Sequence, residues 1–411
     1  MNKLLRGKTL IALLLSVLLA LSVAGCGGTQ QGGQGGEKAK SAGETKPANE
    51  AKKPYKVGLI LDITGKGSAL GVPERNTLKM LVEEQNAKGG INGHLIELVL
   101  YDNESDEMKS VIGAKKLINE DKVAVIIGSS QSGTTMSMVD TVTKAQIPLV
   151  SLASSAKIVT PPADRKWIFK TPQNDSLVAE KIGEYLVEKN LKKVASIKLN
   201  NAFGDSAGAA FQEVAQAKGI TILAEEKIEA ADKDFTSQLT RIKAVKPDAV
   251  VVWSIPPSAS ILTSNYRQMK MEMPLIFNHG IGQKAFIDMA GEAANGVMFP
   301  IGKILVAEAL PDSDPQKQVI LDFVKSYEAK FGSRTTHAGH AWDAFQLVRQ
   351  AMEKAGDDPA KIRDELENTK NFVGIHGVFN MSTEDHSGLR KDDLVFVRIE
   401  NGKWVPAEKL N

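Results

Sequence analysis

Small hydroxyl residues follow two short apolar runs in the middle of the chain. Ser132 closes a serine-rich segment after the run at 123–127, and Ser154 and Ser155 follow the run at 147–151. Hydroxyl groups and the free backbone N–H groups at a helix start suit a bound anion. We therefore expect these serines to form one carboxylate-binding corner. For each serine taken singly, an N-cap or turn role is an equally good interpretation.

The elements that must position these serines form a strand–helix–strand unit. The runs at 123–127 and 147–151 are apolar and rich in β-branched residues, as in strands that are covered on both faces. Residues 132–144 between them carry apolar side chains at helical spacing. Parallel strands joined in this way end at the same edge of a sheet, and ligands of open α/β sheets lie outside that edge.

Strands and helices alternate in the same way along most of the chain. In the first block, a strand at 57–61 precedes a helix that is expected to start near Pro73, and residues 167–172 lead away from the sheet. A second block is expected to contain helices at 176–189, 207–218, 235–244 and 258–269, and strands at 194–199, 220–228, 249–253 and 274–277. This predicts an α/β fold with two doubly wound, Rossmann-like lobes.

The pattern changes after Phe299. Helices without intervening strands are expected at 315–331, 336–355 and 361–368, and we expect them to cover the first lobe. Short antiparallel strands at 378–380, 394–399 and 404–405 follow, with the hairpin signal Asn401-Gly402 between the last two.

The first 53 residues predict export and anchoring. An apolar stretch at 10–23 is too short to be a comfortable membrane span, as in a secretory signal peptide. Cys26, the only cysteine in the sequence, follows Val-Ala-Gly, which resembles the lipobox of bacterial lipoproteins. The resemblance implies a signal peptide over 1–25, lipid on Cys26 and a flexible linker over 26–53. We therefore expect an extracytoplasmic protein that is lipid-anchored to the bacterial cell membrane.

Composition and motif spacing argue against several other functions. The 51 basic and 49 acidic residues give a net charge of +2, which provides no strong field for nucleic acid. Gly65, Gly67 and Gly71 form G-x-G-x-x-x-G, one residue longer than the dinucleotide fingerprint. Residues 128–133 miss the G-x-S-x-G nucleophile elbow because the second glycine comes one residue late. We expect neither enzyme activity nor a cofactor.

His337 and His340 are candidate metal ligands because they lie one turn apart on an expected helix. A metal site needs further ligands, and the sequence offers no third one at suitable spacing nearby. We therefore expect no metal, and we interpret both histidines as polar residues at a helix start.

The order of several short motifs resembles the type I periplasmic solute-binding proteins of ABC transporters, specifically the branched-chain amino acid and amide group, over residues 55–409. The matching motifs are Thr64-Gly65, 86–93 (NAKGGING), Tyr101-Asp102, 127–130 (IGSS), Phe203-Gly204, 233–235 (KDF), Gly296-Val297, 340–344 (HAWDA) and 374–380. The resemblance implies two α/β lobes joined by a three-strand hinge, with a small ligand enclosed between them by hinge closure.

In that family, hydroxyl groups after the third and fourth strands hold the ligand carboxylate. Matching by position places these hydroxyls on Ser132 and Ser155, with backbone N–H groups near Gly133 and Ser154 as further donors and Gln131 beside them. This agrees with the carboxylate-binding corner inferred from the residues alone.

The other half of the implied site departs from amino acid binders. Gly280 stands where those proteins carry the acid that pairs with the ligand ammonium, and Phe203, Ile255 and Leu70 replace their aromatic positions. A buried ammonium without a counter-charge is costly. We therefore expect a carboxylate with an apolar or aromatic body, with His279 as a donor, although a slip of one residue would instead bring Asn278 to the acid's place.

The resemblance also implies how the lobes and partners are arranged. The first lobe would comprise residues 54–172 and 301–371, and the second residues 173–300 and 372–411. The expected partners are the carboxylate solute and the ABC permease subunits, to which the protein would deliver a branched-chain amino acid-like solute. The alternative is a ligand-sensing receptor or adaptor that uses the same two-lobe clamp to signal to a membrane partner.

Overall fold

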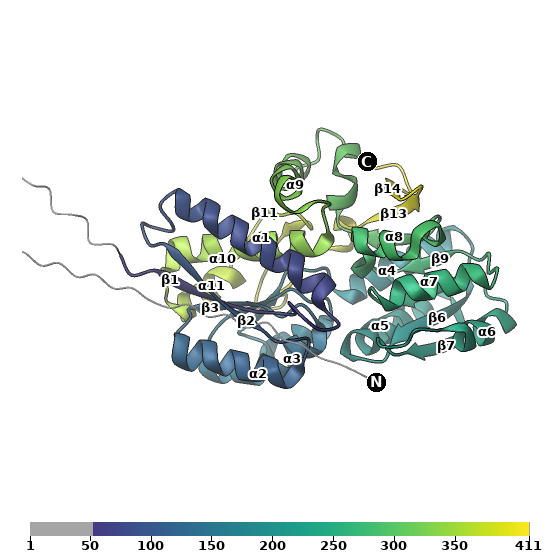
Figure 1. Ribbon diagram of the computed structural model, residues 1–411, viewed down its shortest axis with the longest axis horizontal. Coiled ribbons are helices and arrows are strands. Elements are labelled where there is room, and N and C mark those ends of the chain that lie inside the picture. The colour runs from purple at the N-terminus through teal and green to yellow at the C-terminus, as the bar shows by residue number, and fades with distance from the viewer. Residues whose placement is uncertain (1–51, 411) are drawn as a thin grey trace, which may run out of the picture. The chain divides into compact units, whose positions relative to one another are not determined.

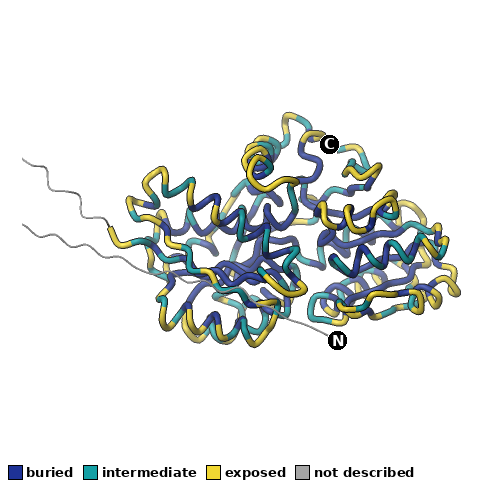
Figure 2. Tube along the Cα trace, viewed as in Figure 1, coloured by how far each residue is buried: buried dark blue, intermediate teal, exposed yellow. Residues whose placement is uncertain are grey.

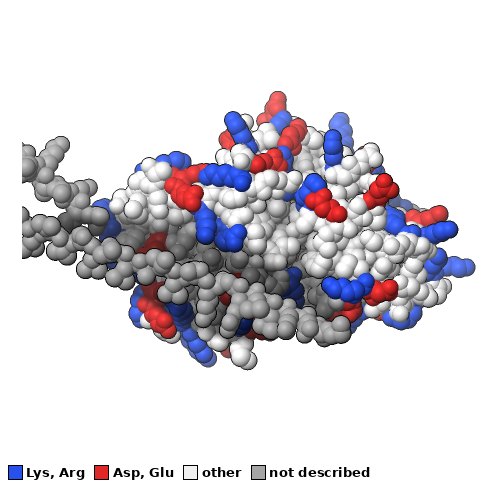
Figure 3. All heavy atoms as spheres, viewed as in Figure 1, with Lys and Arg blue, Asp and Glu red and all other residues white. Residues whose placement is uncertain are grey.

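The computed structural model describes residues 52–410. The expected signal peptide, Cys26 and all but the end of the expected linker lie outside the described residues. Within residues 52–410, no helix combines the length and apolar character that crossing a membrane requires. Basic and acidic side chains are interspersed over the face drawn in Figure 3, as the near-balanced composition predicts.

The first sheet is entirely parallel, which confirms the predicted strand–helix–strand order. Its strands, in spatial order, are β2 (Ile96–Asp102), β1 (Tyr55–Leu61), β3 (Val125–Gly128), β4 (Leu149–Ser151) and β5 (Ile168–Lys170). The helices α1 (Ser68–Ala87) and α10 (Thr336–Ala355) pack together over one face, and α2 (Glu107–Lys116) and α3 (Ser132–Ala145) over the other (Figure 1). The expectation that C-terminal helices cover the first lobe is therefore confirmed for α10.

The second sheet is mixed. Its strands, in spatial order, are β14 (Lys403–Pro406), β13 (Val395–Glu400), β10 (Met298–Ile301), β9 (Leu275–Phe277), β8 (Ala249–Trp253), β6 (Lys193–Leu199) and β7 (Thr221–Ile228). The two C-terminal strands are antiparallel and meet at the predicted Asn401-Gly402 turn, where both residues have positive φ. A separate pair is formed by β11 (Phe372–Val373) and β12 (Val378–Phe379).

Helices cover both faces of the second sheet. One layer contains α4 (Asp175–Glu188) and α5 (Ala202–Lys218), and the other contains α6 (Thr236–Ala244), α7 (Ser258–Gln268) and α8 (Lys284–Ala290). The remaining helices are α9 (Lys317–Phe331) and α11 (Pro359–Glu367), and α11 packs on α10. The chain passes between the two sets of layers after β5, after β10 and before β13. The exact lobe boundaries at 172, 300 and 371 stay a prediction.

Strand β8 shows why some strand segments of the sequence are apolar at every position. Val250 and Val252 belong to the hydrophobic cluster under α6 and α7, whereas Val251 and Trp253 belong to the cluster under α4 and α5. Alternate residues of a strand point to opposite faces, so a strand covered on both sides needs apolar residues at every position. Figure 2 shows the inner strands such as β8 buried and the outer surfaces of the helices and loops exposed, and the edge strand β7 is largely exposed or half-buried.

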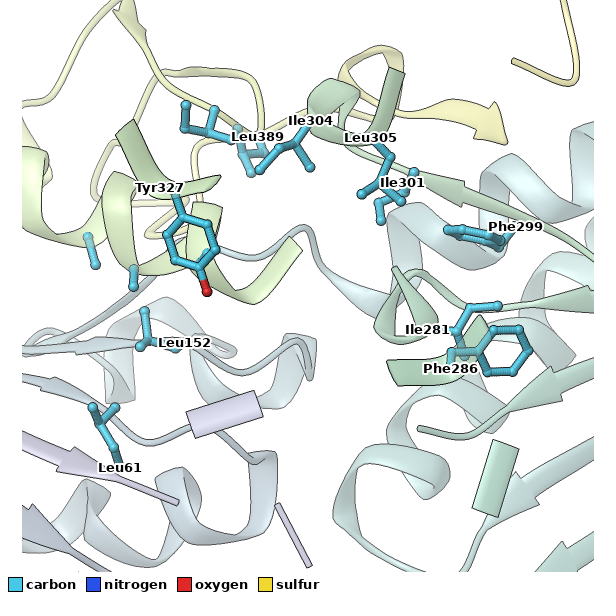
Figure 4. Packing of buried hydrophobic residues seen from close by; sticks show 14 of the residues in the cluster. Leu61, Leu152, Ile281, Phe286, Phe299, Ile301, Ile304, Leu305, Tyr327 and Leu389 are labelled. Atoms are coloured by element: carbon cyan, nitrogen blue, oxygen red, sulfur yellow. The ribbon is translucent and has the colours of Figure 1, made fainter. Parts of the chain in front are cut away.

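One hydrophobic cluster continues from the first sheet to the second. Figure 4 shows Leu61 and Leu152 on the side of the first sheet and Phe286 and Phe299 on the side of the second. The segment 303–309 after β10, which is buried at 304–307, contributes Ile304 and Leu305 between them, and Leu389 lies beside these residues. The crossings between the lobes are therefore themselves part of the core.

Three expectations about element boundaries are wrong. Helix α1 begins at Ser68 and not near Pro73, because the Gly67 carbonyl accepts bonds from the N–H groups of Leu70 and Gly71 and starts the helix earlier. Residues 168–170 do not lead away from the sheet, because they form its fifth strand.

The third boundary concerns α5, which starts at Ala202 and not at residue 207. Asn201 sets this start, since its side-chain oxygen accepts from the Gly204 N–H at 2.9 Å. The expectations also omitted α8 and β10, which are short elements with seven and four residues respectively.

Candidate functional site

A cavity of about 690 Å³ lies where the carboxyl ends of both sheets meet, and residues of both lobes line it. All the predicted ligand residues except Ser155 are at its wall: Leu70, Gln131, Ser132, Gly133, Ser154, Phe203, Ile255, His279 and Gly280. Its volume falls in the range of small-molecule sites. The structure thus brings together residues that are up to 210 positions apart in the sequence.

Ser132 occupies the first position of α3, where backbone N–H groups are free to bind an anion. Ser132 exposes only 3% of its surface, and its Oγ accepts a hydrogen bond from the Ser155 N–H at 3.3 Å. The Ser155 Oγ accepts from the Lys157 N–H at 3.2 Å. Ser155 is therefore an N-cap that is not among the residues lining the cavity, and direct contact of its hydroxyl with a ligand stays a prediction.

A buried polar network fixes the strand ends below Ser132. The Asp62 carboxylate accepts from Ser129 Oγ at 2.7 Å and from Asn103 Nδ2 at 2.9 Å, and the Gln131 side-chain amide also donates to it. These bonds connect the ends of β1, β2 and β3. The predicted Gln131 side chain is consequently held against Asp62.

Ser130 also lines the cavity and leads to a buried acid that sequence reasoning missed. Its Oγ accepts from the Asp62 N–H at 3.2 Å and donates to Glu74 Oε2 at 2.5 Å. Burial raises the pKa of Glu74 well above its ordinary value. Burial of the group behind this part of the wall therefore favours the protonated form of its carboxyl.

Lys170 is a second buried group that sequence reasoning missed. Its Nζ donates to the Ser154 carbonyl at 2.6 Å and to Asn174 Oδ1 at 2.7 Å, so it ties the serine loop to the crossing after β5. Burial lowers the pKa of Lys170 to about 7, an effect that Asp175 partly opposes. A lysine inside a short apolar run, as in IFK, was the sequence signal for a buried amine.

The second lobe contributes a mainly apolar wall. Phe203 comes from the start of α5, and Ile255 follows β8. The Asn278 side chain donates to the Ser254 carbonyl at 2.7 Å and accepts from the Gly280 N–H at 2.7 Å, so both of its ends are bonded to backbone. At Gly280, an added Cβ would lie 2.8 Å from Asn278 Oδ1 and 2.9 Å from Ile255 Cγ2, so a side chain there would require these neighbours to shift.

The acidic residues among those that line the cavity, Asp106 and Glu107, are exposed at the start of α2. Asp106 caps that helix, because its carboxylate accepts from the Lys109 N–H at 2.8 Å. The buried part of the described wall thus carries no carboxylate that would pair with a ligand ammonium.

Three buried histidines complete the inner wall: His279, His337 and His340. Desolvation lowers the pKa of His279 to about 3 and that of His337 to about 4, and it lowers the pKa of His340 well below its ordinary value. Within residues 52–410, no group of three or more His, Cys, Asp or Glu side chains has the arrangement to hold a metal ion. The tertiary structure therefore makes His337 and His340 neutral wall residues, a role that their spacing alone did not indicate.

Comparisons with known proteins agree with this geometry. The family described as periplasmic binding protein matches residues 54–403. A Leu/Ile/Val-binding protein of Rhizobium johnstonii is 26% identical over 356 residues, which cover 86% of this chain and 93% of that protein.

Two solved structures show the same architecture. An extracellular ligand-binding receptor from Rhodopseudomonas palustris HaA2 is 29% identical with a TM-score of 0.81, covering 86% of this chain and 100% of that one. The branched-chain amino acid transporter substrate-binding protein of Streptococcus pneumoniae, in complex with isoleucine, is 27% identical with a TM-score of 0.76, covering 86% and 98%. The chain therefore belongs to the periplasmic binding protein family, as a type I member of the branched-chain amino acid ABC transporter group.

Proposed function

We propose that this protein is the extracytoplasmic substrate-binding lipoprotein of an ABC importer, anchored through Cys26, and that it captures a small carboxylate-bearing solute and delivers it to the permease. The observation that carries the proposal is the convergence of Ser132, the start of α3 and the 152–154 loop on one cavity between two lobes. Such a site binds without chemistry, because its hydroxyl and backbone N–H groups are arranged to hold an anion.

We propose that the rest of the solute is apolar, either aliphatic or aromatic. Leu70, Phe203 and Ile255 supply apolar wall. The Rhizobium johnstonii relative is a Leu/Ile/Val-binding protein, and the Streptococcus pneumoniae structure contains isoleucine. A free amino acid fits the wall less well, since the described buried wall offers an ammonium no counter-charge. The solute is therefore expected to keep the carboxylate and to lack the ammonium.

Closure of the two lobes around the solute is driven by contacts that only the second lobe adds. A solute held first by Ser132 and the start of α3 gains contacts with Phe203 and Ile255 when the lobes close. The free energy of these additional contacts sets how far the equilibrium shifts towards the closed state.

The experiment is calorimetric titration with leucine, its deaminated analogue 4-methylpentanoate and benzoate. The Ser132→Ala variant removes one hydroxyl donor and is expected to weaken carboxylate binding by roughly 1–3 kcal/mol, or about 5- to 150-fold. Ser264→Ala is the matched control, because the Ser264 Oγ bonds to the Ser260 carbonyl on α7, away from the cavity. Tight binding of leucine together with no binding of the deaminated acids would contradict the proposed solute class, and unchanged affinity in Ser132→Ala would contradict the proposed site.

A further inference from the structure

The three histidines of the inner wall have ring nitrogens without a protein partner. His279 follows β9, and His337 and His340 lie in the first turns of α10. None of the three exposes more than 4% of its surface. In the described part of the chain, both nitrogens of His279 and Nδ1 of His340 lack a hydrogen-bond partner, whereas the Gly280 backbone lies within hydrogen-bonding reach of His337. Because an unpaired buried polar atom is costly, a polar group of a ligand that reached these nitrogens would stabilise the complex.

The rings are held in place by packing against one another. The centroid of the His340 ring lies 5.6 Å from that of His337 and 6.4 Å from that of His279. Behind them, His376 lies 4.1 Å from His340 and is fixed by a 2.9 Å contact between its Nδ1 and Asp343 Oδ2. The wall is therefore organised before any ligand binds, which favours selective recognition.

All three rings are neutral at physiological pH, since desolvation lowers their pKa values. A neutral imidazole carries one N–H donor and one lone-pair acceptor. The acid beside His337 is Glu74, whose Oε1 lies 4.0 Å from His337 Nδ1 and whose pKa burial raises. The backbone of Gly280 is the other polar neighbour of His337.

This surface offers donors and acceptors but no net charge. It cannot balance an ammonium, which needs an opposite charge when it is buried. A hydroxyl group suits it, because a hydroxyl donates one bond and accepts others.

On the basis of the carboxylate-binding function proposed above, we infer that His279, His337 and His340 recognise an uncharged hydroxyl group of the solute. The protein then selects hydroxylated carboxylic acids over the corresponding amino acids and over acids that lack the hydroxyl. A site built to bond a hydroxyl discriminates strongly against an analogue without it, because its own buried polar groups are left unpaired.

Two matched ligand sets test the inference on the unaltered protein by calorimetric titration. The aliphatic set is 2-hydroxy-4-methylpentanoate, 4-methylpentanoate and leucine, and the aromatic set is 4-hydroxybenzoate, benzoate and 4-(aminomethyl)benzoate. In at least one set, the hydroxylated acid is expected to bind about tenfold or more tightly than the other two members.

Variants then assign the preference to the rings. His279→Phe and His337→Phe keep a planar ring and remove its nitrogens, so each is expected to reduce the affinity for the hydroxylated acid and to leave that for the hydroxyl-free acid unchanged. His94→Phe is the matched control, because His94 lies outside the cavity and stacks on Tyr55 at 4.2 Å. Thermal unfolding of each variant verifies that it is folded.

The outcomes separate this inference from the proposal on which it rests. Equal binding of hydroxylated and hydroxyl-free acids in both sets, or tightest binding of the amine-bearing members, would overturn the role of the histidines and leave the carboxylate site standing. Equal weakening of both kinds of acid in the Phe variants would also overturn it. If no acid of either set binds, the carboxylate proposal fails and this inference fails with it.

Discussion

The buried His337 makes the free energy of unfolding depend on pH, and the variant His337→Gln should remove that contribution. Burial lowers the pKa of His337 from 6.5 to about 4 in the folded protein. Between these two values the unfolded chain binds a proton at this residue and the folded chain does not. The contribution of His337 to stability is therefore fully present above pH 6.5 and is lost as the pH falls towards 4.

The magnitude follows from the two pKa values. Between pH 7.5 and pH 5.0, the linkage relation gives a loss of about 2 kcal/mol from this one residue. Burial also raises the pKa values of Glu74, Asp175 and Asp343, which changes stability with the opposite sign. Asp175 and Asp343 are present in both proteins, so they cancel in the difference between wild type and variant. Glu74, His279 and His340 interact with His337, so their smaller contributions add to the measured difference.

The assay is urea denaturation of both proteins at pH 7.5 and pH 5.0, followed by circular dichroism. The free energy of unfolding of wild type relative to His337→Gln is expected to fall by about 2 kcal/mol at the lower pH. Ser264→Ala, which changes no titratable group, is expected to show the same difference from wild type at both pH values. A wild-type minus His337→Gln difference that does not change with pH would show that His337 is not held neutral in the folded protein, and the reasoning about the histidine wall would fail.

Three further substitutions test other parts of the structure. Asp343→Asn removes one of the acceptor oxygens that bond two backbone amides and an imidazole, so urea denaturation should show a loss of about 2 kcal/mol; no loss would mean that these bonds add nothing. Gly204→Ala places a Cβ 1.9 Å from the Leu199 carbonyl oxygen. The melting temperature of this variant should therefore drop by several degrees, at roughly 2–4 °C for each kcal/mol lost. An unchanged melting temperature would contradict the close approach. Lys170→Met removes the hydrogen bond to the Ser154 carbonyl, which holds the serine loop. Calorimetry should show that the folded variant binds the carboxylate about tenfold more weakly. Unchanged affinity would show that Lys170 does not position this loop for binding.

The elements predicted well from the sequence are those whose signal is local. The strand at 249–253 and the helix at 336–355 have the predicted bounds, because an apolar run and an uninterrupted helical period define them within the segment itself. Strand β5 was missed because its three residues, Ile168–Lys170, are too few to show a period. It is a strand only because the edge of β4 lies beside it.

For the candidate site, the sequence alone placed Ser132 at a helix start after a buried strand, since that placement depends on neighbouring residues. Tertiary structure decided that Ser155 caps a short helix behind the wall. It also decided the states of Glu74 and Lys170, and gathered the histidines of α10 near His279. The physical reason is that periodicity and capping are properties of adjacent residues, whereas desolvation and hydrogen bonding depend on groups that only the folded chain brings into contact.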